Sequence, residues 1–361
     1  MKIEAVGRFL PDEILMEARM KYAVGLLDDG QLADIEDGAV RDVVERQIAR
    51  GLPYVASGEL RGKHRAKDFW FGLKGIACDY AAPWHIYQLT EVPVGQLRLA
   101  ERIAYNPEHP LFRDFAFLHD AVAGRALCRQ SLPSPANLLL EIFSLTDGYP
   151  EPLYLSADAL VADIAEAYRL TLLQLHELGC ASVLFDDTAC GLMGDDGFTD
   201  RLLQGGVDII GLQRLIIEVI NASVEGLPDD METAVCLSGG ENVVPEWEAV
   251  RYPGNMMPAV LESLRVDKFF LPFDGDNDSS LEVLRHVPEG KKVVLGLVEA
   301  GSPFPDDASA LSSAIRRAMR YVSPDCLYIS PKTGFRLPDY CDRGLSDEEQ
   351  WRRLSEFAAL S

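Results

Sequence analysis

The chain has 361 residues, of which 48% are hydrophobic and 25% are charged, the proportions of a globular protein rather than a disordered one. Lys and Arg number 34 against 57 Asp and Glu, so the formal net charge is −23. Such a charge repels phosphates at long range, which argues against nucleic acid or an anionic membrane as a partner.

Cellular location can be predicted from three further features. No stretch approaches about 20 uninterrupted apolar residues, the length that a membrane helix needs. The opening residues MKIEAVGRFLPDE contain acids and lack the apolar core of a secretory signal. The 7 cysteines are scattered and never spaced as CxxC, so we expect free thiols and a cytoplasmic protein.

Short runs of β-forming residues recur along the chain. Most are apolar throughout, as are strands of a parallel sheet that is covered on both faces. The predicted strands are residues 5–10, 54–60, 125–131, 182–187, 233–238, 268–273, 293–298 and 326–331.

Helix signals separate these strands. Ser156 can cap a helix with apolar residues at every fourth position, and Gly179 ends it. A second apolar stripe lies within residues 40–48. Near the end of the chain, Ser346 and Glu349 have the spacing of a capping box.

The alternation of strands and helices predicts an α/β fold, a (β/α)8 TIM barrel formed by residues 1–361 as a single domain. A doubly wound sheet fits less well, because no strand is followed by a GxGxxG turn. Residues 62–112 are rich in aromatic side chains and exceed a normal strand-to-helix connection. We interpret them as an insertion after the second strand, a hairpin plus a helix over one barrel mouth.

Active sites of such barrels lie at the carboxyl ends of the strands. Several carboxylates that converge there could bind a cationic group, of which a substrate amino group is the simplest. Each acid also has a structural interpretation: Glu59 could pair with Arg61, and an aspartate could cap the following helix. The polar residues at the predicted strand ends include Glu59, Arg61, Ser134, Asp186, Asp187, Cys236, Asp274, Glu299 and Lys332.

The same strand ends carry a family resemblance. The segments that carry it are YVASGELRG, LPSPANL, LHELGCASVLFDDT, LRHVPEGKKVVLGLV and ISPKTGF. They resemble cobalamin-independent methionine synthase, above all the single-barrel group that is similar to its C-terminal catalytic half. The resemblance extends from Ala5 to about Trp351. It implies a (β/α)8 barrel that moves a methyl group from methyltetrahydrofolate to homocysteine thiolate with a bound zinc ion.

The resemblance assigns roles to particular residues. Glu59 and Asp186 match the two acids that hold the amino group of the amino-acid substrate. Ser134 lies in the segment that resembles the one beside the folate, and Arg61 follows the Glu59 motif as an arginine does in the family. Arg8 replaces a serine near the substrate carboxylate, so it could bind a carboxylate or phosphate in a two-pronged contact, or pair with a nearby acid.

The zinc ligands of the family are mostly absent. Ala234, Pro272 and Thr333 stand where the family has His, Glu and Cys, and Cys236 is the ligand that remains. A single thiolate cannot hold zinc, so we expect no zinc site of the family type. The DxDxD run at 274–278 could bind a harder ion such as Mg²⁺, or it could be a solvated loop.

Without zinc, a thiol acceptor is not activated in the family's way. We therefore predict methyl transfer from a folate-type donor, methyltetrahydrofolate, to a small amino-acid-like acceptor, with Asp186, Asp187 or Asp274 as the base. Cys236 could be a nucleophile or a packed apolar residue. Two alternatives stay open: a metal-independent lyase or decarboxylase, as in the related uroporphyrinogen decarboxylase barrels, and an amino-acid-binding homologue without turnover.

Overall fold

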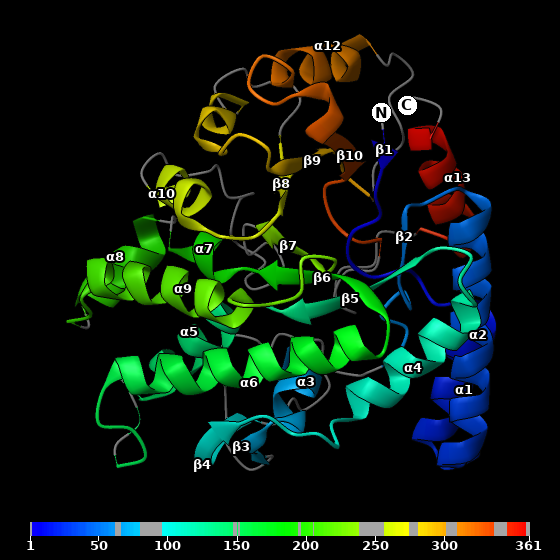
Figure 1. The fold of residues 1–361 in the computed structure, drawn as a ribbon. Helices are drawn as coiled ribbons and strands as arrows, with labels where there is room; N and C mark the ends of the chain where they lie inside the picture. Colours follow the sequence, from blue (N-terminus) through cyan, green and yellow to red (C-terminus); the bar gives the residue numbers. More distant parts are fainter. Residues whose placement is uncertain are drawn as a thin grey trace.

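Eight parallel strands form one curled sheet in the computed structural model, in the order β1-β10-β9-β8-β7-β6-β5-β2 (Figure 1). The structure describes residues 2–61, 66–79, 96–146, 150, 152–193, 196–204, 206–237, 256–273, 281–300, 309–335 and 345–358. Neighbours in the sheet follow one another in chain order and are parallel, as in a TIM barrel. The predicted fold class is confirmed. The strands are β1 (Lys2–Ile3), β2 (Tyr54–Val55), β5 (Leu127–Pro133), β6 (Cys180–Asp187), β7 (Glu232–Leu237), β8 (Lys268–Pro272), β9 (Lys292–Val298) and β10 (Leu327–Pro331).

The two ends of the sheet meet just beyond β1 and β2, where the Phe9 amide donates to the Gly58 carbonyl at 3.0 Å. Two strand predictions differ from the structure: β1 precedes residues 5–10 instead of occupying them, and β2 occupies only the first two residues of 54–60. Gly7 has a φ of 67°, a left-handed conformation that ends the extended chain. A Cβ on Gly7 would lie 2.7 Å from the Gly334 Cα, so this turn also permits close packing against the segment after β10.

Helices surround the sheet and connect successive strands (Figure 1). Two helix predictions are confirmed: Ser156 accepts a hydrogen bond from the Ala159 amide at 3.2 Å, and Ser346 and Glu349 bond each other's backbone amides. No described helix has the length and apolar character that a membrane span requires. The helices of the barrel are α1 (Glu13–Ala23), α2 (Asp29–Ala49), α4 (Pro110–Val122), α5 (Pro135–Thr146), α6 (Ala157–Glu177), α7 (Ala189–Leu192), α8 (Asp196–Gln204), α9 (Ile209–Val224), α10 (Met256–Ser263), α12 (Ser309–Ala318) and α13 (Asp347–Ala358), with short 3-10 helices at Glu282–His286 and Pro324–Cys326.

The segment between β2 and β5 contains α3 (Ala66–Gly72) and an antiparallel hairpin of β3 (Lys74–Asp79) and β4 (Gln96–Ala104). The hairpin contacts the start of α6, since Arg102 Nε lies 2.7 Å from Asp163 Oδ2. The predicted helix and hairpin thus both occur within 62–112. Residues 62–65 and 80–95, which include His64 and His85, lie outside the described ranges, so the predicted position over a barrel mouth stays a prediction.

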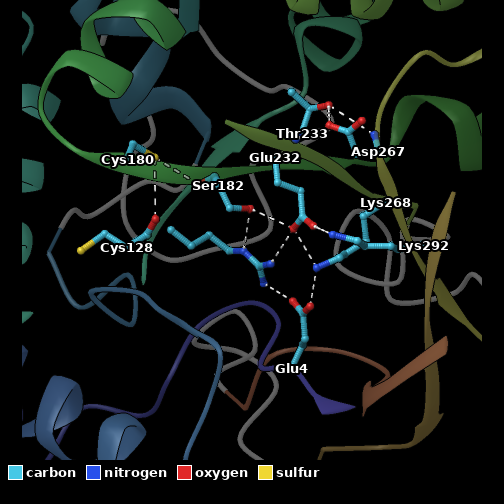
Figure 2. Close-up of polar contacts among 10 residues, drawn as sticks. Glu4, Cys128, Cys180, Ser182, Glu232, Thr233, Asp267, Lys268 and Lys292 are labelled. Atoms are coloured by element: carbon cyan, nitrogen blue, oxygen red, sulfur yellow. Dashed lines mark hydrogen bonds and ion pairs between the residues drawn. The ribbon is translucent and has the colours of Figure 1, made fainter. Parts of the chain in front are cut away.

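A closed ring of alternating charges lies inside the barrel, toward the amino ends of its strands. Figure 2 shows Lys268 between Glu4 and Glu232; its Nζ lies 2.7 Å from Glu232 Oε1 and also bonds the Glu4 carboxylate. Arg129 closes the ring, at 2.6 Å from Glu4 Oε2 and 3.6 Å from Glu232 Oε1. All of these side chains are at most 9% exposed, so the opposite charges offset one another in a buried interior, and the more exposed Lys292 adds a further pair to Glu232 at 2.6 Å.

An apolar layer follows the ring in the direction of the carboxyl ends. Several of its residues come two positions after a ring residue on the same strand, because every second side chain of a strand points into a barrel. Phe270 thus follows Lys268, and Ala234 follows Glu232. The layer is formed by Val6, Leu184, Ala234, Cys236, Phe270, Val294 and Tyr328. Ring and layer together form the floor beneath the carboxyl-end mouth.

Candidate functional site

The end of β6 presents two adjacent carboxylates on opposite sides of the sheet. Leu184 belongs to the inner apolar layer, whereas Phe185 belongs to the core between the sheet and the helices. Because side chains alternate along a strand, Asp186 points inward with Leu184, and Asp187 points outward with Phe185. Asp186 is partly exposed and Asp187 is completely buried. The structure therefore places Asp186, not Asp187, at the mouth.

The contacts of Asp187 are those of a helix cap. Its Oδ1 accepts a hydrogen bond from the Cys190 amide at 2.8 Å, in the first turn of α7. Burial raises the pKa of Asp187, and hydrogen bonds from Ser134 and Cys190 oppose that rise. These contacts agree with the capping interpretation of Asp187 and leave the catalytic interpretation without support. Ser134, predicted to bind substrate, is itself fully buried beside Asp187.

Asn137 holds the backbone on both sides of this carboxylate pair. Its Nδ2 donates to the Asp186 carbonyl at 2.9 Å, and its Oδ1 accepts from the Thr188 and Ala189 amides at 3.0 and 2.9 Å. The sequence prediction missed this residue. The available signal was a single amide in the otherwise apolar run PANLLL, directly after the third barrel strand.

Arg8 and Glu59 form an ion pair where the sheet ends meet. The Arg8 Nε lies 3.6 Å from the Glu59 Oε2, with side chains that are 9% and 31% exposed. The hydrogen bond between Phe9 and Gly58 brings the two residues together, because each is the chain neighbour of one of the bonded residues. Of the two interpretations of Arg8, pairing with a nearby acid is the one observed.

The backbone of Glu59 is in a left-handed conformation, with a φ of 51°. Among the described non-glycine residues this conformation occurs at one other position, Ala123, which caps the end of α4. Glu59 caps no helix, and a left-handed conformation costs a non-glycine residue about 1 kcal/mol. Strain of this kind is concentrated at functional sites, so the conformation supports a role for the Glu59 carboxylate beyond folding.

Arg61 contacts the helices around the barrel. Its guanidinium pairs with Asp37 on α2, lies 3.6 Å from Asp114 Oδ1 on α4 and stacks 4.6 Å from the centre of the Phe117 ring. The alternative pairing of Arg61 with Glu59 is not the one observed. These contacts link the β2 end to the helix layer, and the substrate-binding role of Arg61 stays a prediction.

Two further ion pairs lie after barrel strands. Lys332, which follows β10, has its Nζ 3.3 Å from the Glu299 Oε1, which follows β9. Lys67 on α3 and Glu141 on α5 form a buried pair at 3.8 Å. Burial raises the pKa of Glu141 to about 7 although Lys67 opposes the rise. Sequence reasoning missed this second pair because its partners come from the insertion and from an apolar helix.

The residues at the family's zinc positions do not fit a zinc ion. Ala234 is a fully buried methyl side chain of the inner layer, and Pro272, at the end of β8, has no side-chain donor atom. The Thr333 hydroxyl donates to the Gly334 carbonyl at 3.3 Å, which leaves the Cys236 thiol as the one soft ligand of the set. Among the described residues no three His, Cys, Asp or Glu side chains gather as a metal site would require.

Several predicted site residues cannot be placed. The run 274–278 with Asp274 is outside the described residues. The predictions of a base at Asp274, of a harder metal ion at the DxDxD run and of the absence of zinc therefore stay predictions. Cys236 is described: it is 7% exposed in the inner apolar layer, as the packed-residue interpretation expects.

Comparison of the sequence with known proteins shows relatives over nearly the whole chain. YxjH, an uncharacterised protein of Bacillus subtilis, is 28% identical over 354 residues, which are 98% of this chain and 92% of YxjH. A methionine synthase of Pyrococcus furiosus is 22% identical over 339 residues, 94% of this chain and 82% of that protein. No family model matches the chain.

Solved structures agree with the fold. A candidate vitamin-B12-independent methionine synthase from Listeria monocytogenes superposes with a TM-score of 0.77 at 24% identity, covering 100% of this chain and 98% of that one. A B12-independent methionine synthase from Shewanella, in complex with selenomethionine, gives 0.68 at 18% identity, covering 99% and 95%. These structures establish the fold, and with the sequence relatives they confirm that the chain resembles the cobalamin-independent methionine synthase family, from which it has diverged.

Proposed function

We propose that this protein is a methionine-synthase-like group-transfer enzyme that binds a small amino-acid-like substrate at the carboxyl end of its barrel. Relatives over nearly the whole chain are methionine synthases, and the Shewanella neighbour is a complex with selenomethionine. The observation that carries the proposal is the Arg8–Glu59 pair, together with the inward-facing Asp186 at the same end of the barrel.

An amino acid at neutral pH carries an ammonium and a carboxylate on the same carbon atom. Arg8 and Glu59 offer the complementary charges 3.6 Å apart, so the zwitterion can replace their mutual contact with one contact to each. Asp186 adds a second carboxylate for the ammonium or for a proton. This division of roles explains why a guanidinium in place of the family's serine is compatible with amino-acid binding.

The reaction that we propose is methyl transfer from a folate-type donor, methyltetrahydrofolate, to that substrate. The bond between methyl carbon and donor nitrogen breaks, the bond between methyl carbon and acceptor forms, and the proton of the acceptor passes to the donor nitrogen. Because the residues at the family's zinc positions do not fit zinc, the proton acceptor that we propose is a carboxylate, for which Asp186 is the described candidate.

The altered zinc positions also favour a second candidate, a homologue that binds an amino acid without methyl transfer. Ala234, Pro272 and Thr333 remove the ligands that would activate a thiol, whereas Arg8, Glu59 and Asp186 can still bind a zwitterion. The lyase or decarboxylase alternative has no described residue in its favour over these two.

The melting temperature of the protein, measured with methionine and with methyltetrahydrofolate, tests these proposals. A ligand that binds the folded state raises the melting temperature. Stabilisation by both compounds, with homocysteine methylated in a coupled assay, supports methyl transfer. Stabilisation by methionine alone, without turnover, supports the binding homologue, and stabilisation by neither contradicts both. Elemental analysis that finds one zinc per chain would contradict the carboxylate mechanism.

A further inference from the structure

Helix α1 has an apolar outer face that the described part of the chain leaves exposed. Leu15 and Ala18 bury one side of this helix, whereas Met16, Met20 and Val24 on the opposite side are 53%, 63% and 71% exposed. Met16 and Met20 belong to α1 and Val24 caps its carboxyl end, and their spacing of four positions makes them one ridge. Large apolar side chains gathered on one face mark an interaction surface more often than single exposed ones do.

The fold does not need α1 in order to connect β1 to β2, because α2 alone makes that crossover. In Figure 1, α1 lies beside α2 at the edge of the molecule, away from the barrel strands. Arg19 Nη2 lies 3.2 Å from Glu36 Oε1, and the Tyr22 hydroxyl donates to Asp29 at 2.7 Å, so α1 is fixed to α2. The backbone that carries the ridge is therefore held in place before a partner binds.

Charged residues beside the ridge make it complementary to itself. Glu17 and Lys21 stand one turn apart on the same flank, 2.9 Å from each other within the helix. If two copies of α1 pack antiparallel about a two-fold axis, Glu17 of each copy faces Lys21 of the other. A parallel arrangement places these flanks on opposite sides of the contact and forms neither pair. One self-complementary patch on both partners is the property of a two-fold dimer interface.

We propose that a second copy of this chain occupies the ridge formed by Met16, Met20 and Val24, so that the protein is a dimer through antiparallel α1 helices. The methionine side chains pack against one another at the centre, and two Glu17–Lys21 pairs flank them. This proposal is independent of the catalytic proposal, because it uses no residue of the barrel mouth.

Sedimentation equilibrium of the full-length protein over a wide concentration range tests the proposal. We expect a dimer whose dissociation constant rises about tenfold or more in Met20→Glu, because a carboxylate would be buried at the contact. Glu17→Lys and Lys21→Glu should each weaken the dimer, and the double variant E17K/K21E should restore it. Ile210→Glu, at an exposed apolar residue of α9, is the matched control and should leave the dimer unchanged.

Three outcomes would overturn the proposal. In the first, the wild-type protein stays monomeric at every concentration, even if its α1 helix then binds a different protein. Another is a wild-type dimer that Met20→Glu does not weaken, since the contact then lies elsewhere. In the third, the double variant E17K/K21E does not restore the dimerisation that the two single charge reversals weaken. That result would contradict the antiparallel arrangement. Melting temperatures close to wild type would show that the variants fold.

Discussion

The guanidinium of Arg8 lies 3.6 Å from the carboxylate of Glu59, across the point where the two ends of the barrel sheet meet. Neither residue belongs to a strand; each follows one, and the Phe9–Gly58 hydrogen bond sets their separation. The same contact that completes the barrel thus also assembles the pair of opposite charges on which the proposed amino-acid site rests.

The first prediction concerns this pair. Glu59→Gln removes the negative charge but keeps the shape, so affinity for methionine should fall at least about tenfold, or about 1.4 kcal/mol. Isothermal titration calorimetry measures the change. The control is Glu45→Gln, which removes an exposed carboxylate that pairs with Arg125 far from the mouth. An equal loss in both variants would show that net charge, not the site, is responsible.

The second prediction separates the two aspartates of β6. Asp186→Asn should weaken methionine binding at similar thermal stability, because the carboxylate is partly exposed at the mouth. Asp187→Ala should instead lower the free energy of unfolding by about 1–3 kcal/mol, since the buried Cys190 amide loses its acceptor. Urea denaturation and calorimetry on both variants provide the measurement. The reverse pattern would mean that the inward and outward assignments are wrong.

The third prediction concerns the charge ring. Glu4→Gln leaves Arg129 and Lys268 with fewer anionic partners in the interior and should destabilise the protein by about 3–5 kcal/mol. The double variant Glu4→Gln with Lys268→Met should be less unstable than the sum of the single variants, because the two residues are coupled. Glu218→Gln, in an exposed pair with Arg214, should cost less than about 1 kcal/mol. Additive losses in urea denaturation would contradict a closed ring.

The fourth prediction is a pH dependence from Glu141. Burial raises its pKa from the ordinary 4.5 to about 7 in the folded protein. Between pH 4.5 and about 7, the folded protein holds a proton on Glu141 that the unfolded chain has released. The contribution of this group to the free energy of unfolding therefore falls as the pH rises through this range. Wild type and Glu141→Gln should therefore differ in the slope of stability against pH between these values. Parallel curves would show that the Glu141 carboxyl keeps its ordinary pKa.

Sequence reasoning reached the barrel because its strands are apolar runs and its helices begin at recognisable caps, as Ser156 and Ser346 show. It missed the charge ring for a physical reason. Glu4, Glu232 and Lys268 stand at the edges of apolar runs, where polar residues normally mark a strand end that faces water. Here they point into the barrel, and only pairing among four strands makes that burial favourable.

In the candidate site, too, some features could be proposed from the sequence and others required the structure. Glu59 and Asp186 could be proposed as site residues from the sequence, because they follow strands and match a family pattern. The Arg8–Glu59 contact could not, because it joins residues 51 positions apart only after the sheet has curled. The different orientations of Asp186 and Asp187 required the strand register, since a shift by one residue would exchange them.

The charge ring and the apolar layer above it have a consequence for the order of events in turnover. Together these described residues fill the barrel interior at its amino end, so a ligand between the strands would approach Asp186 from the carboxyl end. Under the methyl transfer that we propose, the ligand nearer Phe270 and Cys236 should then bind first and leave last. Initial-rate kinetics of that proposed reaction should therefore show ordered binding of its two substrates.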